Sequence, residues 1–322
     1  NYIKGVINMN NLKKVGLTAL AGALVSVSAN AADITMSGTA SINFAGQEEV
    51  NTGNGWTMSE GITFSMSGEL DNGWTVGVTQ ILNGDDVATE VFDTRYMTID
   101  MGDSGSLTFA ANGGSSVLDA WDDVTPTAGE EAWDDVDSAS AAPGGTGGAN
   151  MFTYTLPSFY DGLTAAVSYT PSGGTTEEAS SSDYGITFTG VEGLTIRAGA
   201  GSDDSDTSAT VDTSIIAATY AMDAFTVGYQ TSEDDSETAD ADVDFEAFGV
   251  SYAVSEELSV SLNSSTHEYE NSSLSDQEAF GISLSYVMGS MTLSANHNTV
   301  DNIAGTAAND RSGYSLNLAF AF

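Results

Sequence analysis

Large apolar and small polar side chains alternate along most of this chain with a period of two residues. Such alternation predicts β-strands, because successive side chains of a strand point to opposite faces of the sheet. We predict sixteen strands, with apolar faces in residues 34–44, 62–70, 74–78, 97–101, 107–109, 152–156, 163–169, 184–188, 194–198, 216–220, 225–229, 248–252, 258–262, 280–286, 291–295 and 314–322.

Short and long connections alternate between these strands, giving seven short turns and eight long loops. The turn at residues 71–73 contains Asn-Gly, which supplies the positive φ angles that a tight hairpin needs. An even number of antiparallel strands with this alternation is the organisation of bacterial barrels, with short periplasmic turns and long extracellular loops. The short strand at residues 107–109 leaves counts of fourteen or eighteen open. We therefore predict an all-β, antiparallel, transmembrane β-barrel.

The last nine residues form the most amphipathic strand of the chain. An exposed apolar edge strand aggregates, so we expect this strand to pair with the first one and close the sheet. The ending resembles the closing strand of Gram-negative outer-membrane barrels, in which a terminal Phe follows alternating apolar residues. The apolar face of this strand consists of Tyr314, Leu316, Leu318, Phe320 and Phe322.

The outward face of the predicted strands has no charged side chain in its central positions, as the bilayer midplane requires. Aromatic residues gather near the strand ends, which is typical of the interfacial girdles of membrane barrels. A soluble sandwich, the alternative, needs no girdles. The predicted girdles are Trp74, Tyr220, Phe225, Tyr252, Tyr286 and Phe322 on the turn side, and Tyr169, Tyr184, Tyr229 and Tyr314 on the loop side.

The opposite face carries mainly Ser, Thr, Gly, Asn and Ala. Side chains of this size do not fill a sixteen-stranded barrel, so we predict an aqueous channel. Charged residues of the predicted pore wall are few. We expect the side chains of Glu69, Asp100 and Arg197 to face the lumen. Arg95 and Arg311 are expected near the mouth of the pore.

The front of the chain differs from the rest. Lys13 and Lys14 precede an apolar stretch at residues 15–27 and an Ala-x-Ala motif at residues 29–31. This order is typical of a secretory signal peptide. We interpret residues 1–8 as upstream sequence outside the natural protein, residues 9–31 as the signal peptide and residues 32–322 as the barrel domain.

Charge and cysteine content narrow the functional classes. The sequence has 46 acidic and six basic residues, for a net charge of −40. Phosphate binding needs clustered Lys and Arg, so nucleic acid is excluded as a partner. Without cysteine the chain has no disulfide, thiolate metal site or thiol nucleophile. High charge with abundant Gly, Ser and Thr can also indicate disorder, but the alternation continues to the last residue.

The third long loop, residues 113–149, is the longest connection, and it contains two tryptophans and no basic residue. The order of signal peptide, sixteen strands, long third loop and terminal Phe resembles the general porins of Gram-negative outer membranes, most of all their alphaproteobacterial branch. The resemblance implies a third loop folded into the barrel, where it narrows the pore. Its constriction residues would be Asp119, Asp122, Asp123, Glu130, Glu131, Asp134 and Asp135.

The same resemblance implies a homotrimer in the bacterial outer membrane that passes small hydrophilic solutes and ions by passive diffusion. The acidic composition favours cations. Further expected partners are outer-membrane lipid, lipopolysaccharide and the barrel assembly machinery. A non-conducting barrel or surface adhesin, with acidic loops that bind cations, is the alternative function.

Catalytic and cofactor chemistry find little support in the sequence. His267 and His297 are expected in separate loops, without a nucleophile or a ligand set beside them, so we predict no enzyme. Acidic runs such as residues 203–206 and 234–235 are interpreted as solvated loop tips. Clustered carboxylates offer Ca²⁺ a weak site, but no EF-hand pattern occurs, and no cofactor or metal is expected.

The signal-peptide interpretation is testable. We expect cleavage between Ala31 and Ala32, because the Ala-x-Ala motif ends there. N-terminal sequencing of protein purified from outer membranes measures this directly. Retention of residues 1–30 in that material would contradict the prediction.

Overall fold

The computed structural model describes residues 33–48, 54–84, 92–172, 180–204 and 209–322. The predicted upstream segment and signal peptide lie outside the described residues, so both stay predictions. Among the described residues, no helix has the length and hydrophobicity needed to span a bilayer.

Sixteen strands occur in the described residues, which confirms the predicted number. They are β1 (Asp33–Gln47), β2 (Trp56–Glu69), β3 (Thr75–Asn83), β4 (Thr94–Asp100), β5 (Ser106–Asn112), β6 (Met151–Thr155), β7 (Leu163–Thr170), β8 (Ser180–Phe188), β9 (Leu194–Asp204), β10 (Val211–Met222), β11 (Phe225–Ser236), β12 (Val243–Ala253), β13 (Leu258–Tyr269), β14 (Gln277–Met288), β15 (Met291–Asp301) and β16 (Arg311–Ala321).

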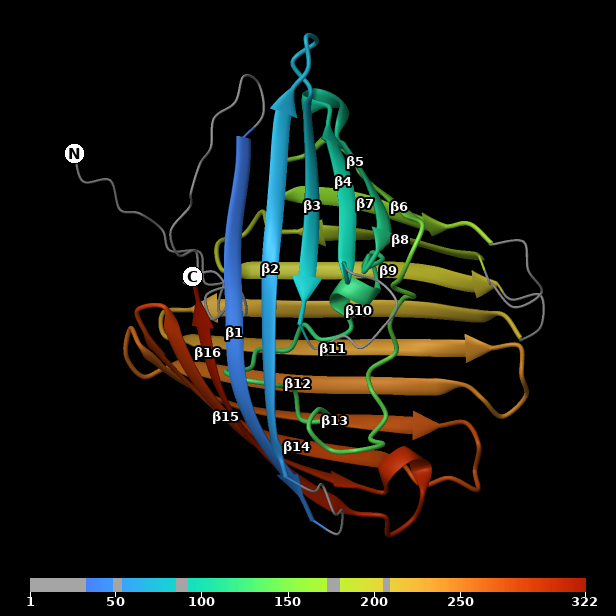
Figure 1. Cartoon of the computed structure of the whole chain (residues 1–322). Helices are drawn as coiled ribbons and strands as arrows, with labels where there is room; N and C mark the ends of the chain where they lie inside the picture. Colours follow the sequence, from blue (N-terminus) through green and yellow to red (C-terminus); the bar gives the residue numbers. More distant parts are fainter. Residues whose placement is uncertain (1–32, 49–53, 85–91, 173–179, 205–208) are drawn as a thin grey trace.

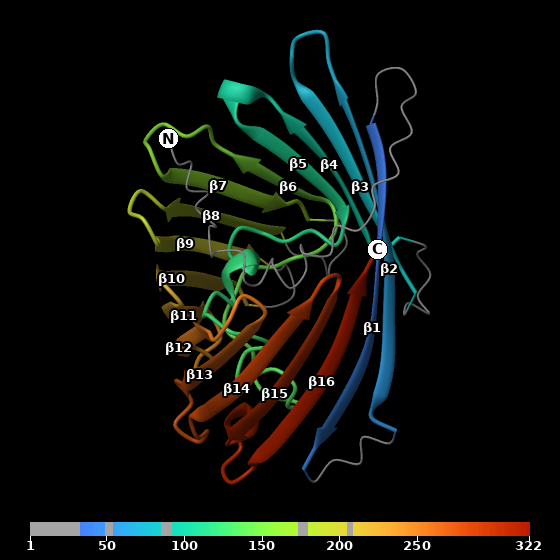
Figure 2. The ribbon, with the colours of Figure 1, turned by 90° about the vertical axis from the view of Figure 1, so that its left-hand side faces the viewer.

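The strands form a closed barrel in which every strand is antiparallel to both neighbours (Figures 1 and 2). The ends of the chain close it, because β16 pairs with β1 in the register Thr39 to Ala321. The Phe322 N–H donates to the Gly38 carbonyl at 2.9 Å, and the Gly38 N–H donates to the Phe322 carbonyl at 3.1 Å. Both sheet edges are thereby removed, as the sequence predicts.

The outer face of the barrel is apolar. All ten aromatic residues predicted for the two girdles are exposed on it, from Trp74 at the turn end to Tyr184 at the loop end. The charged Glu60 lies among the apolar residues of this face: β2 begins at Trp56, six residues before the predicted Ile62, and this places Glu60 outward beside Ala40. The predicted start was late because Glu60 and Gly61 interrupt the apolar alternation.

Several strands continue past the bilayer-facing residues on the loop side. The acidic pair Asp234 and Asp235 belongs to β11, so its interpretation as a loop tip is wrong. His267 and His297 lie in β13 and β15, and their expected loop positions are wrong too. The reason is shared: backbone pairing continues where the outward side chains become polar, as in the register pair Asp212 to Asp235.

The third loop connects β5 to β6 and runs through the barrel interior along the wall (Figures 1 and 2). Lumen-facing glycines lie beneath it in six strands, which makes room for its backbone. A Cβ on Gly199 would lie 2.7 Å from Leu118 Cδ2, and one on Gly281 would lie 3.0 Å from Ala132 Cα. The glycines in contact with the loop are Gly185, Gly199, Gly201, Gly228, Gly249, Gly281 and Gly313.

The glycines follow the sheet register, which explains how a single loop meets so many of them. Gly228 pairs with Gly249 across β11 and β12. The same transverse row continues from Gly249 through Asn263 to Gly281, and then through Asn298 to Gly313. In this half of the barrel, the small residues of the lumen face therefore leave the space into which the third loop packs.

The closing pair can be tested through the last residue. Changing Phe322 to Asp should impair barrel assembly strongly, because the charge lies at the membrane interface and β16 must pair with β1. Phe159→Asp, an equal change at an exposed turn, is the matched control. Heat-modifiable migration of outer-membrane protein on gels reports the folded fraction. Normal folding of the Phe322 variant would refute the closing role.

The close contacts between the wall glycines and the third loop give a second prediction. Gly281→Val should push the third loop off the wall and into the lumen, because the added side chain meets both Ala132 of the loop and Asn298, which holds the loop. Overpacking a tight contact costs roughly 1–3 kcal/mol. Single-channel conductance should fall. Gly77→Val is the control, because a Cβ there has its nearest neighbour at 3.9 Å. Equal conductance in the two variants would show that Gly281 gives the loop no needed room.

Candidate functional site

The third loop is fixed to the wall by polar side chains that project inward from the strands. Ser168 on β7 accepts a hydrogen bond from the Val117 N–H at 3.0 Å, and Ser261 on β13 accepts one from the Ala128 N–H at 2.8 Å. Gln230 on β11 bonds to the backbone of both Asp122 and Val124. The loop backbone thus replaces water as the partner of wall side chains along half of the barrel.

Asparagines on β15 hold the middle of the loop. Asn298 is fully buried, and its amide nitrogen donates to the carbonyls of Glu131 and Asp134 at 2.8 Å each. Asn296 accepts a hydrogen bond from the Glu130 N–H at 3.1 Å. These bonds satisfy backbone groups that would otherwise be buried without partners.

A small apolar core adds to these bonds. Trp133 is 5% exposed, and its ring meets the Phe245 ring edge-on at a centroid distance of 5.1 Å. Val136 joins the same cluster from the loop, Val300 joins it from β15, and Ile303 joins it from the connection between β15 and β16. Burying such side chains stabilises the folded-in loop by the hydrophobic effect. The third loop is therefore docked as a packed element.

The seven predicted constriction acids do not all lie in the same environment. Asp123 and Glu130 are exposed within the barrel, and Asp119, Asp122 and Asp134 are half-buried. Glu131 is only 1% exposed. Asp135 turns to the wall, where Ser315 donates to its carboxylate at 2.6 Å and Asn296 at 3.3 Å. Five of the seven acids thus have side chains accessible from the interior.

Asp119 has a shifted proton affinity. Partial burial raises the pKa of Asp119 above its ordinary value, a hydrogen bond with Ser115 lowers it, and the nearby charge of Asp123 raises it again. Burial outweighs the hydrogen bond because a carboxylate loses more by leaving water than one hydroxyl returns. Asp119 therefore loses its negative charge at a higher pH than an ordinary aspartate.

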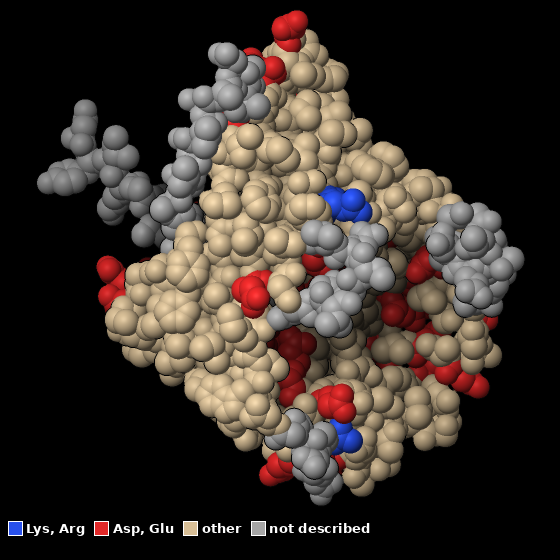
Figure 3. Space-filling model, viewed as in Figure 1, with Lys and Arg blue, Asp and Glu red and all other residues tan. Residues whose placement is uncertain are grey.

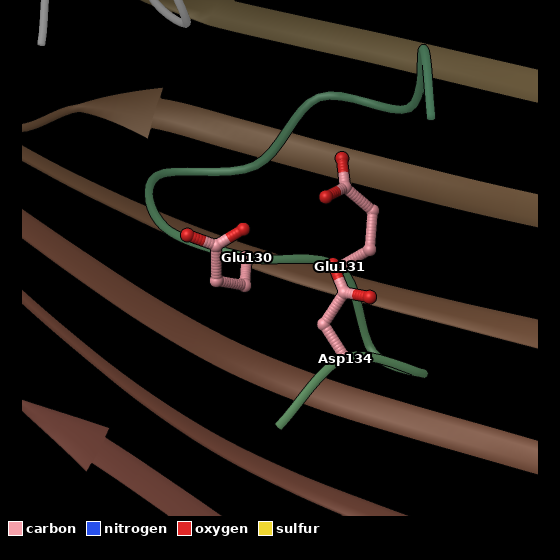
Figure 4. A group of neighbouring side chains, drawn as sticks. All are labelled: Glu130, Glu131 and Asp134. Atoms are coloured by element: carbon pink, nitrogen blue, oxygen red, sulfur yellow. The ribbon is translucent and has the colours of Figure 1, made fainter. Parts of the chain in front are cut away.

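Glu130, Glu131 and Asp134 lie together on the loop (Figure 4). Each offers a carboxylate oxygen, and these oxygens lie within 4.8 Å of one another. Oxygen ligands are those that Ca²⁺ prefers, so this group is the place in the described residues that best matches the expected weak Ca²⁺ site. The Ca²⁺ site itself stays a prediction.

Two of the three arginines beyond residue 31 lie beside acids of the third loop. Arg197 on β9 interacts electrostatically with Asp123. Arg311 starts β16 and contacts Asp137, with its Nη1 3.8 Å from the carboxylate and 3.0 Å from the carbonyl oxygen. Arg95 lies on β4, where the register of the pairing with β5 shifts between Arg95 and Tyr96. Among the described residues, Arg95 is therefore the single basic residue of the wall formed by β1–β6.

Hydroxyl groups take the place of charges on the wall opposite the loop. In β1–β3, Thr35, Ser65 and Thr79 form one inward register row. In the next row, Thr98 and Thr108 are hydrogen-bonded through their hydroxyls at 2.9 Å. The carboxylates of Glu69 and Asp100 end β2 and β4, at the short turns. These two acids lie at the end of the barrel that carries the short turns, which is the predicted periplasmic side.

Acidic side chains gather in and around the hollow of the barrel, with few basic ones on the same face (Figure 3).

The wall side chains that hold the third loop were not predicted from the sequence. Gln230 and Gln277 depart in size from the small residues that otherwise occupy the lumen positions, whereas Asn296 and Asn298 are of a type common there. This departure in size was the available signal.

Comparison with known proteins agrees with this architecture. A sequence profile described as Gram-negative porin matches residues 16–322. A search of curated proteins found no match. Structural similarity is clear at low sequence identity, which shows the shared fold alone.

One similar structure is the anion-selective porin from Comamonas acidovorans, with 14% identity and a TM-score of 0.70 over 90% of this chain and 100% of that one. OmpT of Vibrio cholerae has 11% identity and a TM-score of 0.68, covering 92% and 100%. A mutant of the Rh. blastica porin has 15% identity and a TM-score of 0.62, covering 90% and 100%. From the profile match and the closed sixteen-stranded barrel, we conclude that this chain belongs to the Gram-negative porin family of the bacterial outer membrane.

Proposed function

We propose that this porin passes small hydrophilic solutes and ions by passive diffusion, prefers cations, and is constricted by its third loop. The observation that carries the proposal is the one-sided charge of the interior. Accessible carboxylates project from the third loop, and the opposite wall of β1–β6 carries hydroxyls. Members of this family are channels, so neither catalysis nor a cofactor is part of the proposal.

The sign of the field follows from the distribution of charge. Beyond residue 31 the chain has 46 acidic residues and three arginines, and two of those arginines lie beside loop acids. A negative potential in a narrow pore concentrates cations and repels anions. The Debye length is about 10 Å at 0.1 M salt and about 3 Å at 1 M. Selectivity should therefore be strong in dilute salt and weaken as salt increases.

The similar porin from Comamonas acidovorans is described as anion-selective. This does not decide the selectivity of the present chain, because the two share 14% identity. The fold supplies a water-filled lumen, and the side chains that line it set the sign of the potential. Here the third loop supplies acidic side chains, and Arg197 and Arg311 lie beside acids of that loop, which leaves Arg95 as the remaining arginine of the barrel.

We further infer a homotrimer that contacts outer-membrane lipid and lipopolysaccharide and is inserted by the barrel assembly machinery. A similar structure of OmpT is described as a trimer form. Glu60 supports an assembled state, since it is exposed between Met58 and Ile62 on the outer face of β2. A carboxylate there is costly in contact with lipid and is better placed near a subunit boundary.

The alternative is a non-conducting barrel or adhesin whose acidic loops bind cations. Planar bilayers separate the two functions, because only a pore gives single-channel steps. Absence of conductance from correctly folded protein would favour the adhesin.

Cation preference can be tested with the zero-current potential across a KCl gradient. The parent should be cation-selective. A variant with five accessible acids neutralised should lose most of this preference, since it removes five negative charges beside the lumen. The changes are Asp119→Asn, Asp122→Asn, Asp123→Asn, Glu130→Gln and Asp134→Asn. Glu131 and Asp135 are kept because they lie against the wall.

A matched control removes five acids from the outer face at the loop end of the same barrel. The control changes are Asp212→Asn, Glu233→Gln, Asp235→Asn, Asp244→Asn and Glu268→Gln, all at exposed positions. This control should keep most of the parental potential. An anion-selective parent would overturn the electrostatic argument, and an equal loss in both variants would remove the third loop from the filter.

A further inference from the structure

Residues 140–141 belong to the returning part of the third loop, the part that leads back to β6. This segment is held by a histidine on the inner face of the barrel wall. His267 lies on β13, is 1% exposed, and packs against Phe245 at a ring centroid distance of 4.7 Å. Its Nε2 lies 2.8 Å from the Ala141 carbonyl oxygen of the loop, and its Nδ1 lies 3.2 Å from Gln277 Nε2 on β14. Both ring nitrogens therefore have a partner.

Gln277 holds the neighbouring loop residue from the same wall. Its Oε1 accepts from the Ser140 N–H at 2.8 Å and from the Ala304 N–H at 3.0 Å. Its Nε2 donates to the Ser140 carbonyl at 3.0 Å. The Ser140 hydroxyl is 2.9 Å from the Tyr269 hydroxyl. Three wall side chains thus bind two consecutive loop residues.

This network fixes the tautomer of the imidazole. Backbone N–H groups only donate, so the Gln277 atom that receives two of them must be the oxygen. The other amide atom is then the nitrogen, which donates to His267 Nδ1. The imidazole must accept at Nδ1 and donate from Nε2 to the Ala141 carbonyl. Only neutral imidazole can do both.

Protonation removes the acceptor. A hydrogen on Nδ1 would face the Gln277 amide hydrogens, and two donors repel each other. The groups in contact with the ring are Phe245, Tyr269, Gln277 and the loop backbone. Tyr269 is the titratable one among them. The acidic neighbours Asp244 and Glu268 are exposed on the outer face, so they do not pair with the ring.

We propose that His267 and Gln277 form a proton-sensitive clamp that positions residues 140–141 of the third loop against the wall. Neutral imidazole keeps the clamp closed, and imidazolium opens it. The wall lies behind the loop, so a released segment moves toward the lumen and narrows the pore. His267 is a positioning residue, and its effect on conductance rests on the proposed role of the third loop as the constriction.

Single-channel conductance at about pH 7.5 and about pH 4.5, on both sides of the ordinary imidazole range, tests the clamp. The parent should show lower conductance or added closures at the acidic pH. The ratio of docked to released loop should change by about five-fold, the effect of one lost hydrogen bond. His267→Gln keeps a donor for the Ala141 carbonyl and does not titrate, so it should keep neutral conductance and lose this part of the acid response.

His297→Gln is the matched control, because His297 is exposed on the outer face of β15. It should keep the full parental acid response. Carboxylates also titrate near the lower pH, and the difference between the two histidine variants removes their contribution. An acid response in His267→Gln equal to that of the parent would overturn the clamp.

A second readout is independent of conduction. The chain has no cysteine, so Ala142→Cys introduces a single thiol beside the clamp. At the acidic pH this thiol should be labelled faster with His267 present than in the His267→Gln background. Equal rates would refute the clamp. Unequal rates with unchanged conductance would support the clamp and contradict the third loop as the constriction.

Discussion

Closure of the sheet is the constraint on which the rest of this structure depends. A sheet with an apolar outer face in a bilayer must satisfy every backbone N–H and C=O within the barrel, because lipid offers no hydrogen-bond partner. The pairing of β16 with β1 and the two bonds between Gly38 and Phe322 complete that requirement. The apolar face can then remain exposed to lipid, and the polar face encloses the lumen.

The lumen is shaped by a second set of backbone requirements. A loop that enters a barrel carries its own unpaired amides, and here wall side chains such as Gln230, Asn296 and Asn298 bond to them. The transverse glycines let the loop approach closely enough for those bonds. Packing and hydrogen bonding therefore place the third loop along β7–β16, and the open channel lies toward β1–β6, where the hydroxyls are.

This asymmetry links structure to the proposed selectivity. Acids on the loop and hydroxyls opposite give the interior one sign of charge, since Arg197 and Arg311 lie beside loop acids. The His267 clamp belongs to the same arrangement, because it binds the returning part of the loop to β13 and β14. In the proposed function, the position of the loop sets the width of the lumen and where its charges lie.

The sequence by itself determined the barrel, its sixteen strands and its closing strand, because period-two alternation reports which face each side chain takes. It also predicted the acidic third loop. Only the tertiary structure decided that Glu131 and Asp135 turn to the wall, that Glu60 lies on the outer face and that His267 clamps the loop. These features depend on contacts between residues far apart in the chain, such as Ala141 and His267, and local alternation carries no information about such pairs.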